Sequence, residues 1–462
     1  MATPYQITKP LRRACDRCYE LKARCQLAHS AAKCSRCERL DLTCSTARPI
    51  RAAGRKVQRR KHSASTKLSK TQHENIVAWL NDASDLLPEE RDLLIFLLGR
   101  PETLDCYVVC PSFQAAAQQS LATQLSAALP TVKDAYLAFA IALKRLSSSL
   151  STNSGDMVRH ASSAMATLRS LPVANQQDAT LCLTLGAALA LSMHSTIGMG
   201  VAEICRYCLT TTTPFMEKTV LSDEPSTAWR GFMVLLETMD CLVHRRRPAT
   251  RLHFDSPGEV DRHLGLCSPL LPYYYDLCII SHSLTSTTNT DVLALLRKQL
   301  DGIHTSVEAW KPFLPGLSAS QFESAEIVNL LAQARVYRLG ALLVSHRLRH
   351  AFGEQDDSAD IWSKEVLMEL EIAHQVTQRP MRCITLPFMI AAVEIRDRHA
   401  RSRAIESIDE YVDDCSPVVR GAAADFLRKV WLERDLQITS CWLDSIHKPC
   451  PVIHSIETAC AA

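Results

Sequence analysis

The stretch CDRCYELKARC, residues 15–25, carries three cysteines separated by two and then six residues. The same spacing returns nine residues later in CSRCERLDLTC, residues 34–44, so the pattern C-x2-C-x6-C occurs twice in succession. The six cysteines concerned are Cys15, Cys18, Cys25, Cys34, Cys37 and Cys44. Disulfides are the first alternative, but residues 1–30 show no apolar signal-peptide segment. Close cysteine pairs in a chain without a secretion signal are more typical of a metal site.

The number of thiols bears on the number of metal ions. Zinc accepts thiolates and takes four ligands in a closed structural site. One zinc ion would leave two of the six cysteines unused. Two zinc ions need eight sulfur positions, so two thiolates would have to bridge the metals. Iron–sulfur clusters use four thiolates, usually at other spacings. The repeat therefore favours a cluster of two Zn²⁺ ions, with a single zinc site as the alternative.

The segment around these cysteines has too few apolar residues for a core of its own. Its large apolar side chains between residues 11 and 44 are Leu11, Tyr19, Leu21, Leu27, Leu40 and Leu42. Burial of so little apolar surface cannot offset the conformational entropy of the chain. We therefore expect metal binding to supply much of the folding free energy of this segment.

Residues 15–44 resemble the DNA-binding cluster of the fungal Zn2Cys6 transcription factors. The resemblance implies that the first and fourth cysteines, Cys15 and Cys34, bridge two zinc ions and that each half forms a short helix. It also implies that the first helix reads a base triplet, commonly CGG, in the major groove. Lys22, four residues after the second cysteine, stands where the family has its base-contacting lysine. Arg24 stands where a basic residue usually contacts phosphate.

Two features depart from the common pattern of this family. Tyr19 and Glu20 follow the second cysteine, where many members have Arg or Lys. Residues 26–33, between the two halves, contain no proline, although many members have one there. These departures concern the preferred DNA half-site more than the cluster itself.

The basic residues of the chain are concentrated at its N-terminal end. Residues 1–70 hold 18 Lys and Arg against 4 Asp and Glu, a net charge of +14, whereas the remainder holds 34 against 45, a net charge of −11. This split is typical of a protein that binds a polyanion. A Lys or Arg commonly reads guanine, and the other bases contact phosphate. The candidate DNA-binding residues are Lys22, Arg24, Arg12, Arg13 and Arg17.

Composition divides the chain at residues 49 and 85, and the resemblance implies a Zn2Cys6 DNA-binding domain at 11–48, a basic linker at 49–84 and an all-α regulatory domain at 85–455. The linker is rich in Lys, Arg, Ser and Thr, which predicts flexibility. Its dense basic run predicts a nuclear localisation signal. Further phosphate contacts or a plain solvated tether are the alternatives. The residues of this run are Arg55, Lys56, Arg59, Arg60 and Lys61.

Family members often carry a coiled coil after the cluster, which pairs two copies of the chain. Here the apolar positions from Ile76 to Leu87 give barely two heptads before Pro88. A stable coiled coil needs three or four heptads. A homodimer and a monomer that reads a single triplet therefore both fit the sequence.

The acidic region at 85–455 has few glycines and no alternating strand pattern, and its apolar residues recur at helical spacing. Such stripes run along residues 330–348 and 232–242. Pro88, followed by two glutamates, predicts the start of a helix that ends at Gly99. The expected fold is mostly α, with a small two-zinc Zn2Cys6 cluster domain, a flexible basic linker and a large all-α helical regulatory domain.

Three further segments have an unusual charge pattern. Residues 179–202 contain no Asp, Glu, Lys or Arg and are long enough to cross a bilayer. They are rich in Ala, Thr, Ser and Gly and lack basic flanks, which favours a buried helix with its turn. The run His244–Arg247 is interpreted as a surface helix end. The segment IDEYVDD at 408–414 is interpreted as a charged helix face, with an activation segment as the alternative.

The chain contains no G-x-S-x-G, H-E-x-x-H or G-x-x-x-x-G-K-[ST] motif, so we expect it not to be an enzyme. We expect a nuclear, sequence-specific DNA-binding transcription factor of RNA polymerase II genes, with two Zn²⁺ ions bound. Its expected partners are double-stranded DNA and the transcription machinery, with no membrane. Compact family members often regulate a fungal secondary-metabolite gene cluster. The alternatives are an enzyme or ligand sensor at 85–455 that the cluster delivers to chromatin, and a zinc-stapled protein-interaction module of little sequence specificity.

Overall fold

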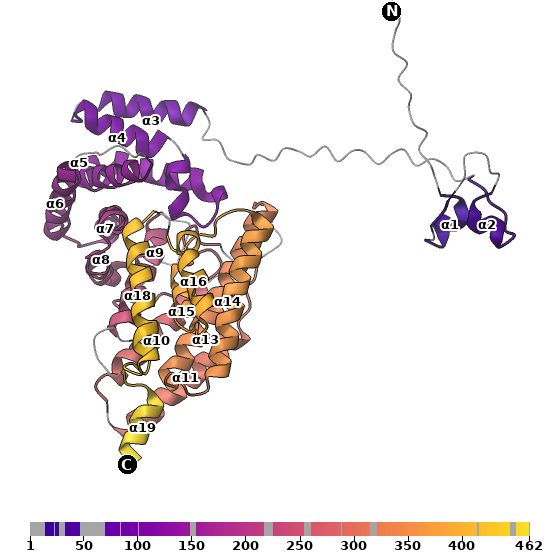
Figure 1. The fold of residues 1–462 in the computed structure, drawn as a ribbon. Helices are drawn as coiled ribbons and strands as arrows, with labels where there is room; N and C mark the ends of the chain where they lie inside the picture. Colours follow the sequence, from indigo (N-terminus) through magenta and orange to yellow (C-terminus); the bar gives the residue numbers. More distant parts are fainter. Residues whose placement is uncertain are drawn as a thin grey trace, which may run out of the picture. The chain divides into compact units, whose positions relative to one another are not determined.

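The protein forms two compact units, Met1–Ala64 and Ser65–Ala462, in the computed structural model (Figure 1). The described residues contain helices and turns but no strand, which confirms the expected mostly α fold. The structure describes residues 14–22, 24–26, 33–46, 70–83, 85–99, 101–147, 154–216, 225–253, 260–287, 289–314, 321–413, 415–443 and 450–461.

The first unit contains two five-residue helices, α1 (Asp16–Glu20) and α2 (Ser35–Arg39). Each begins directly after a cysteine, because the thiol of Cys15 or Cys34 accepts a hydrogen bond from the backbone N–H three residues later. A thiol here takes the place of the Ser or Asp that usually caps a helix. The cysteine spacing therefore sets where both helices begin.

The two halves of this unit repeat each other in structure as well as in sequence. The backbone N–H of Asp16 donates to Ser45 O at 2.8 Å, and the N–H of Ser35 donates to Gln26 O at 3.0 Å. In both cases the first residue of a helix is held by the residue that follows the last cysteine of the other half. Two equivalent backbone hydrogen bonds thus connect the two halves.

The second unit is a helical array, in which α13 and α14 run side by side and α7 packs against both α5 and α8 (Figure 1). Its helices are α3 (Lys70–Asp82), α4 (Pro88–Gly99), α5 (Gln114–Ser147), α6 (Ser154–Ser170), α7 (Gln176–Thr196), α8 (Val201–Met216), α9 (Pro225–His244), α10 (Leu271–Leu284), α11 (Thr290–Ala309), α13 (Ser324–Arg349), α14 (Asp356–Thr377), α15 (Thr385–Ala392), α16 (Arg398–Glu406), α17 (Ile408–Tyr411), α18 (Pro417–Asp435) and α19 (Ile453–Ala461), with short 3-10 helices η1 (Pro101–Tyr107), η2 (Pro111–Phe113) and η3 (Ser268–Leu270).

Helix α3 lies within the range predicted for the basic linker, so the end of that range is structured. Leu80 of α3 is fully buried. The guanidinium of Arg91 on α4 donates to Leu80 O at 3.0 Å, which joins the end of α3 to the next helix. Leu80 thus belongs to the core of the second unit, although the basic composition before it predicts a tether.

The predicted helical stripes are confirmed. The stripe at 330–348 is buried along α13, and α4 has the predicted bounds, Pro88–Gly99. The residues of this stripe are Leu330, Ala334, Tyr337, Ala341, Val344 and Leu348. Three helical segments of the described chain are long and apolar enough to cross a membrane, Pro111–Ser147, Gln176–Thr196 and Ser324–Arg349. In α7, 78% of the most apolar window is buried inside the protein, as the prediction of a buried helix requires.

The prediction of a surface helix end at His244–Arg247 is wrong for Arg245, which is only 2% exposed. Its backbone adopts a left-handed conformation, with φ at 49°, directly after the last residue of α9. The guanidinium then donates to Ser281 O at 3.0 Å and to Pro451 O at 2.8 Å. Arg245 therefore ties α9 to α10 and to the C-terminal segment, while Arg246 and Arg247 stay exposed.

A second buried arginine, Arg347 of α13, crosslinks several helices. Its guanidinium donates two bonds to Glu394, at 2.9 and 2.7 Å, and one to Asp356 at 2.7 Å. The Arg347 side chain has no exposed surface, and that of Glu394 is only 2% exposed. Burial alone would lower the pKa of Arg347, but the two carboxylates more than compensate and raise it.

Candidate metal centre and nucleic-acid interface

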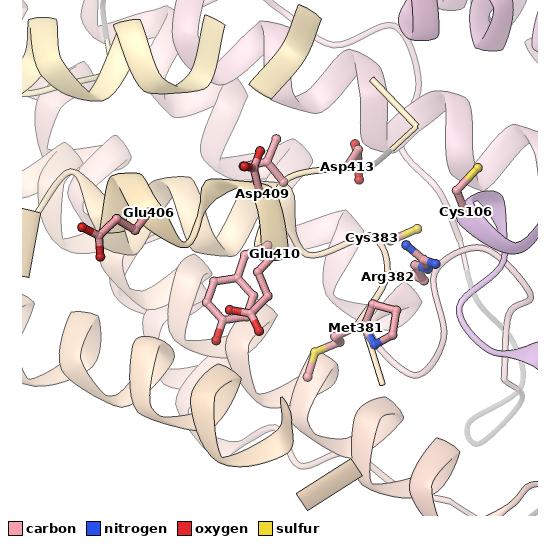
Figure 2. A pocket seen from close by; sticks show the side chains of 11 residues that line it. Cys106, Met381, Arg382, Cys383, Glu406, Asp409, Glu410 and Asp413 are labelled. Carbon is pink, nitrogen blue, oxygen red and sulfur yellow. The ribbon is translucent and has the colours of Figure 1, made fainter. Parts of the chain in front are cut away.

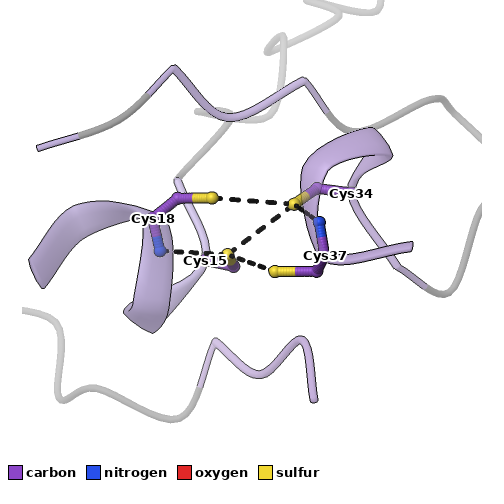
Figure 3. A group of neighbouring side chains, drawn as sticks. All are labelled: Cys15, Cys18, Cys34 and Cys37. Carbon is purple, nitrogen blue, oxygen red and sulfur yellow. Dashed lines mark hydrogen bonds between the residues drawn. The ribbon is translucent and has the colours of Figure 1, made fainter. Parts of the chain in front are cut away.

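Four thiols gather at the centre of the first unit, two from each half (Figure 3). The Sγ atoms of Cys15, Cys18, Cys34 and Cys37 all lie within 4.8 Å of one another. Cys15 Sγ lies 3.8 Å from Cys34 Sγ and 3.7 Å from Cys37 Sγ, and Cys18 Sγ lies 3.8 Å from Cys34 Sγ. All four side chains are buried, and none forms a disulfide.

The other two predicted ligands, Cys25 and Cys44, lie at the edge of the same group. Cys25 Sγ accepts a hydrogen bond from the backbone N–H of Cys15 at 3.3 Å, and Cys44 Sγ accepts one from Cys34 at the same distance. Both are half-buried and pack against the four central cysteines. The structure thus brings all six predicted cysteines together, with Cys15 and Cys34 in contact with members of both halves.

The thiols have unequal proton affinities. The backbone N–H of Cys37 lowers the pKa of Cys34 to about 6, and the backbone N–H of Cys18 lowers the pKa of Cys15. Burial raises the pKa of Cys18 to about 12. A buried set of sulfur donors is typical of soft-metal sites such as those of zinc. The cluster can therefore bind metal, and a bound cation would stabilise the thiolate form of all its ligands.

Among the described residues of the first unit, the cysteines themselves form the buried core. The larger apolar side chains point outwards, since Tyr19 is 62%, Leu21 is 59% and Leu40 is 49% exposed. Leu42 is half-buried and packs against the thiols, and one such side chain contributes little hydrophobic stabilisation. This arrangement fits a metal-dependent fold, because metal–thiolate bonds would replace the missing apolar core.

The predicted DNA-binding residues that the structure describes lie at the surface of the first unit. Arg17, Lys22 and Arg24 are all exposed. Lys22 ends the turn after α1 in a left-handed conformation, with φ at 48°, and its N–H donates to Tyr19 O at 3.1 Å. Arg12, Arg13 and the predicted localisation signal lie outside the described residues. The lysine predicted to read bases is therefore available for contact with DNA.

The structural repeat reveals a difference between the halves that our sequence interpretation missed. Asp41 occupies the position in the second half that Lys22 occupies in the first, with φ at 45° and the same backbone hydrogen bond, here to Glu38 O at 3.2 Å. Each residue also follows the second cysteine of its half by four positions, so the sequence carried the signal. Only the first half presents a cation at this point.

The second unit contains an acidic cavity of about 340 Å³ (Figure 2). Glu406, Asp409, Glu410 and Asp413 line it, and Arg382 is the cation among its lining residues. Part of the segment IDEYVDD, which was predicted to form a charged helix face, therefore lines a cavity. Burial would raise the pKa of Asp413, but the hydrogen bond and charge of His194 lower it. Asp413 Oδ2 lies 3.3 Å from Nε2 of that histidine.

The second unit also shows to which family the chain belongs. The fungal specific transcription factor domain matches residues 134–451, more than half of the chain. No curated protein and no solved structure matches the chain. The matching family is one of transcription factors and not of enzymes, and it implies DNA binding and a nuclear role. The chain therefore belongs to the fungal specific transcription factor domain family, and its N-terminal cysteine cluster is consistent with the Zn2Cys6 type.

Proposed function

We propose that this transcription factor reads CGG-like triplets through a cluster of two zinc ions and one lysine, Lys22. The observation that carries the proposal is a six-thiol cluster in which the turn after the first helix presents an exposed lysine, whereas the equivalent turn of the second half presents an aspartate. Cys15 and Cys34 would be the bridging ligands, since each lies within 3.8 Å of thiols from the opposite half. Zinc would supply the folding free energy of the module, and the protein's own side chains would make the DNA contacts.

The difference between Lys22 and Asp41 supports the proposal that the first half of the cysteine module recognises the DNA bases. A lysine can donate to guanine O6 and N7 in the major groove. A carboxylate at the equivalent point of the second half would be repelled by phosphates. Arg17 and Arg24 are exposed on the same half as Lys22 and would contact phosphate, which fixes the register without reading sequence. Arg12 and Arg13 are proposed to add further phosphate contacts.

The finer features of the function rest on the resemblance to Zn2Cys6 factors and on composition. They are a DNA-binding domain at 11–48, a basic linker at 49–84 that carries the nuclear localisation signal and ends in α3, the first helix of the second unit, and a regulatory domain at 85–455. We also propose contact with the transcription machinery of RNA polymerase II, and homodimer formation as the alternative to a monomer. The target genes are proposed to form a fungal secondary-metabolite gene cluster.

A selection from randomised duplex DNA by the zinc-loaded full chain tests this proposal. Lys22→Ala should lose the enriched triplet, because it removes the base contact. Lys33→Ala is the matched control, since it removes the same charge from the same module at the residue that pairs with Asp41 at 3.6 Å. It should weaken binding to all sequences alike and leave the preferred triplet unchanged.

The results separate sequence reading from charge. Loss of the enriched triplet in Lys22→Ala alone supports the proposal. Enrichment of two triplets at a fixed spacing would indicate that two copies of the chain bind together. If both variants retain the same triplet, Lys22 is not the reader. If the wild-type chain enriches no sequence, the module is a general polyanion binder and the proposal fails.

A further inference from the structure

The second unit contains an apolar cavity that the DNA-binding function does not use. Its volume is about 470 Å³, and residues of α8, α9, α15 and α18 line it. Leu236 of α9 and Ile390 of α15 form part of its buried floor, together with Trp442. Small-molecule sites commonly have volumes of about 300–1,000 Å³ and mainly apolar walls. The cavity therefore has the size and the lining of a ligand site.

Ionisable side chains line the mouth of the cavity, its exposed side, and two of them are carboxylates. Asp240 and Glu203 both line it, and Arg246 bridges them, with Nη1 at 3.3 Å from Asp240 Oδ2 and 3.2 Å from Glu203 Oε1. His244 Nε2 lies 3.4 Å from the other oxygen of Asp240. An ionised carboxylate offers about four acceptor sites, so Asp240 can still accept a hydrogen bond from a ligand.

The turn between α7 and α8 places a further apolar side chain at this cavity. Gly198 and Gly200 both have positive φ, at 74° and 78°, which allows the chain to reverse within a few residues. Met199 between them lines the cavity and is 74% exposed. Met239 and Met389 line it as well. Methionine side chains adapt their shape readily, so such a wall can close around ligands of different outlines.

From these observations we infer that the cavity binds a small, uncharged, mainly apolar molecule that carries a hydroxyl donor. The apolar part would lie against Leu236, Ile390 and Trp442, and the hydroxyl would donate to the carboxylate of Asp240. Two carboxylates against one guanidinium at the mouth disfavour a ligand with a negative charge. The acidic cavity of Figure 2 differs in its lining, which includes four carboxylate side chains.

Three probes with the same fused ring test the inference on the full zinc-loaded chain by isothermal titration calorimetry. They are 2-naphthol, 2-methoxynaphthalene, which lacks the donor, and 2-naphthoate, which is anionic. We expect saturable binding of one 2-naphthol per chain, with each of the other two bound about tenfold more weakly. Asp240→Asn should reduce the discrimination against 2-naphthoate. Equal affinities for naphthol and naphthoate, or the absence of saturable binding, would overturn the inference.

Two substitutions locate the ligand, and one serves as their control. Ala423→Trp fills the cavity from its buried wall, and Ala422→Trp covers it from an exposed position on the same helix. Both should weaken 2-naphthol binding at least about tenfold. Ala294→Trp adds the same side chain to a separate surface hollow on α11 and should leave affinity unchanged. Equal binding by the folded Ala422→Trp and Ala294→Trp variants would place the ligand elsewhere and overturn the assignment.

A spectroscopic signal identifies the cavity independently of affinity. Trp442 lines the cavity and is 4% exposed. A bound naphthol should therefore quench its fluorescence, whereas Trp442→Phe should show a smaller change, because five other tryptophans remain, and still bind in calorimetry. A fluorescence change of undiminished size in Trp442→Phe would contradict the assignment. Melting temperatures of all variants establish that each is folded before its affinity is compared.

Discussion

Cys15 Sγ and Cys34 Sγ lie 3.8 Å apart, and each thiol caps the first turn of its own helix. The sulfur atoms of these two cysteines therefore have two structural roles. Each accepts the hydrogen bond that caps a helix, and each lies at the centre of the thiol cluster. A substitution at either position would remove a candidate metal ligand and a helix cap together. Metal binding by these thiols would consequently be coupled to the fold of the first unit.

Removal of a central ligand should abolish DNA binding. We predict that Cys18→Ala leaves the first unit unfolded, because its buried core consists of the clustered thiols. The measurement is DNA affinity together with metal content per chain. Cys106→Ala is the control, since this half-buried cysteine lies in the second unit. Full metal content in Cys18→Ala would argue against the cluster.

A chelator should act on one unit only. We predict that EDTA removes the metal and DNA binding, whereas the far-ultraviolet circular dichroism of the second unit keeps its intensity and melting temperature. The reason is that the second unit has its own apolar core from α3 onwards. Metal analysis of the untreated chain should give about two zinc ions. Loss of the bulk of the helical signal on chelation would contradict this prediction.

Arg347 should matter far more than its neighbour Arg349 two residues along α13. Arg347→Ala would leave Glu394 buried without its partner, and we expect a cost of about 3–5 kcal/mol in unfolding free energy. Arg349 pairs with Asp301 at 2.6 Å, but the side chains are 29% and 55% exposed. Arg349→Ala should cost no more than about 1 kcal/mol. Denaturant unfolding of both variants measures the difference, and equal costs would show that Arg347 is not a structural crosslink.

His263 should make the second unit sensitive to acid. Its ring stacks on Trp229 with centroids 4.5 Å apart, and its Nδ1 lies 2.5 Å from Tyr107 O. Burial lowers the pKa of His263 to about 3. The unfolded chain, with an ordinary histidine pKa near 6.5, therefore binds more protons than the folded chain between these values. Unfolding free energy should fall as pH drops from 6.5 towards 3, by up to about 1.4 kcal/mol per pH unit.

The control for this pH dependence is His263→Phe, which keeps an aromatic ring without a titrating group. Its unfolding free energy should depend on pH with a slope smaller by about one proton. His346, whose pKa burial lowers to about 4, should maintain part of the slope in the variant. Unchanged slopes in denaturant unfolding at pH 7, 6 and 5 would mean that His263 binds the same number of protons in both states and that burial does not lower its pKa.

The sequence predicted the parts of this protein that depend on spacing. The six cysteines could be grouped because metal ligands recur at fixed intervals, and the stripe of α13 could be found because core positions recur every three or four residues. Arg245 and Arg347 could not be predicted as buried, because their carboxylate and carbonyl partners come from distant segments. Likewise, Leu80 joins the core only because α4 packs against it. The apolar cavity is lined by residues of several helices, so the pattern of no single segment could predict it.

The repeat of the first unit, broken by Lys22 and Asp41, gives the module a direction. If the two halves were identical, the module would make the same contacts with DNA in either orientation. With a lysine in this turn of one half and an aspartate in the same turn of the other, a triplet and its reverse complement on the same strand would hold the bound module in opposite orientations. The order of bases in a promoter would then specify which way the protein faces, as well as where it binds.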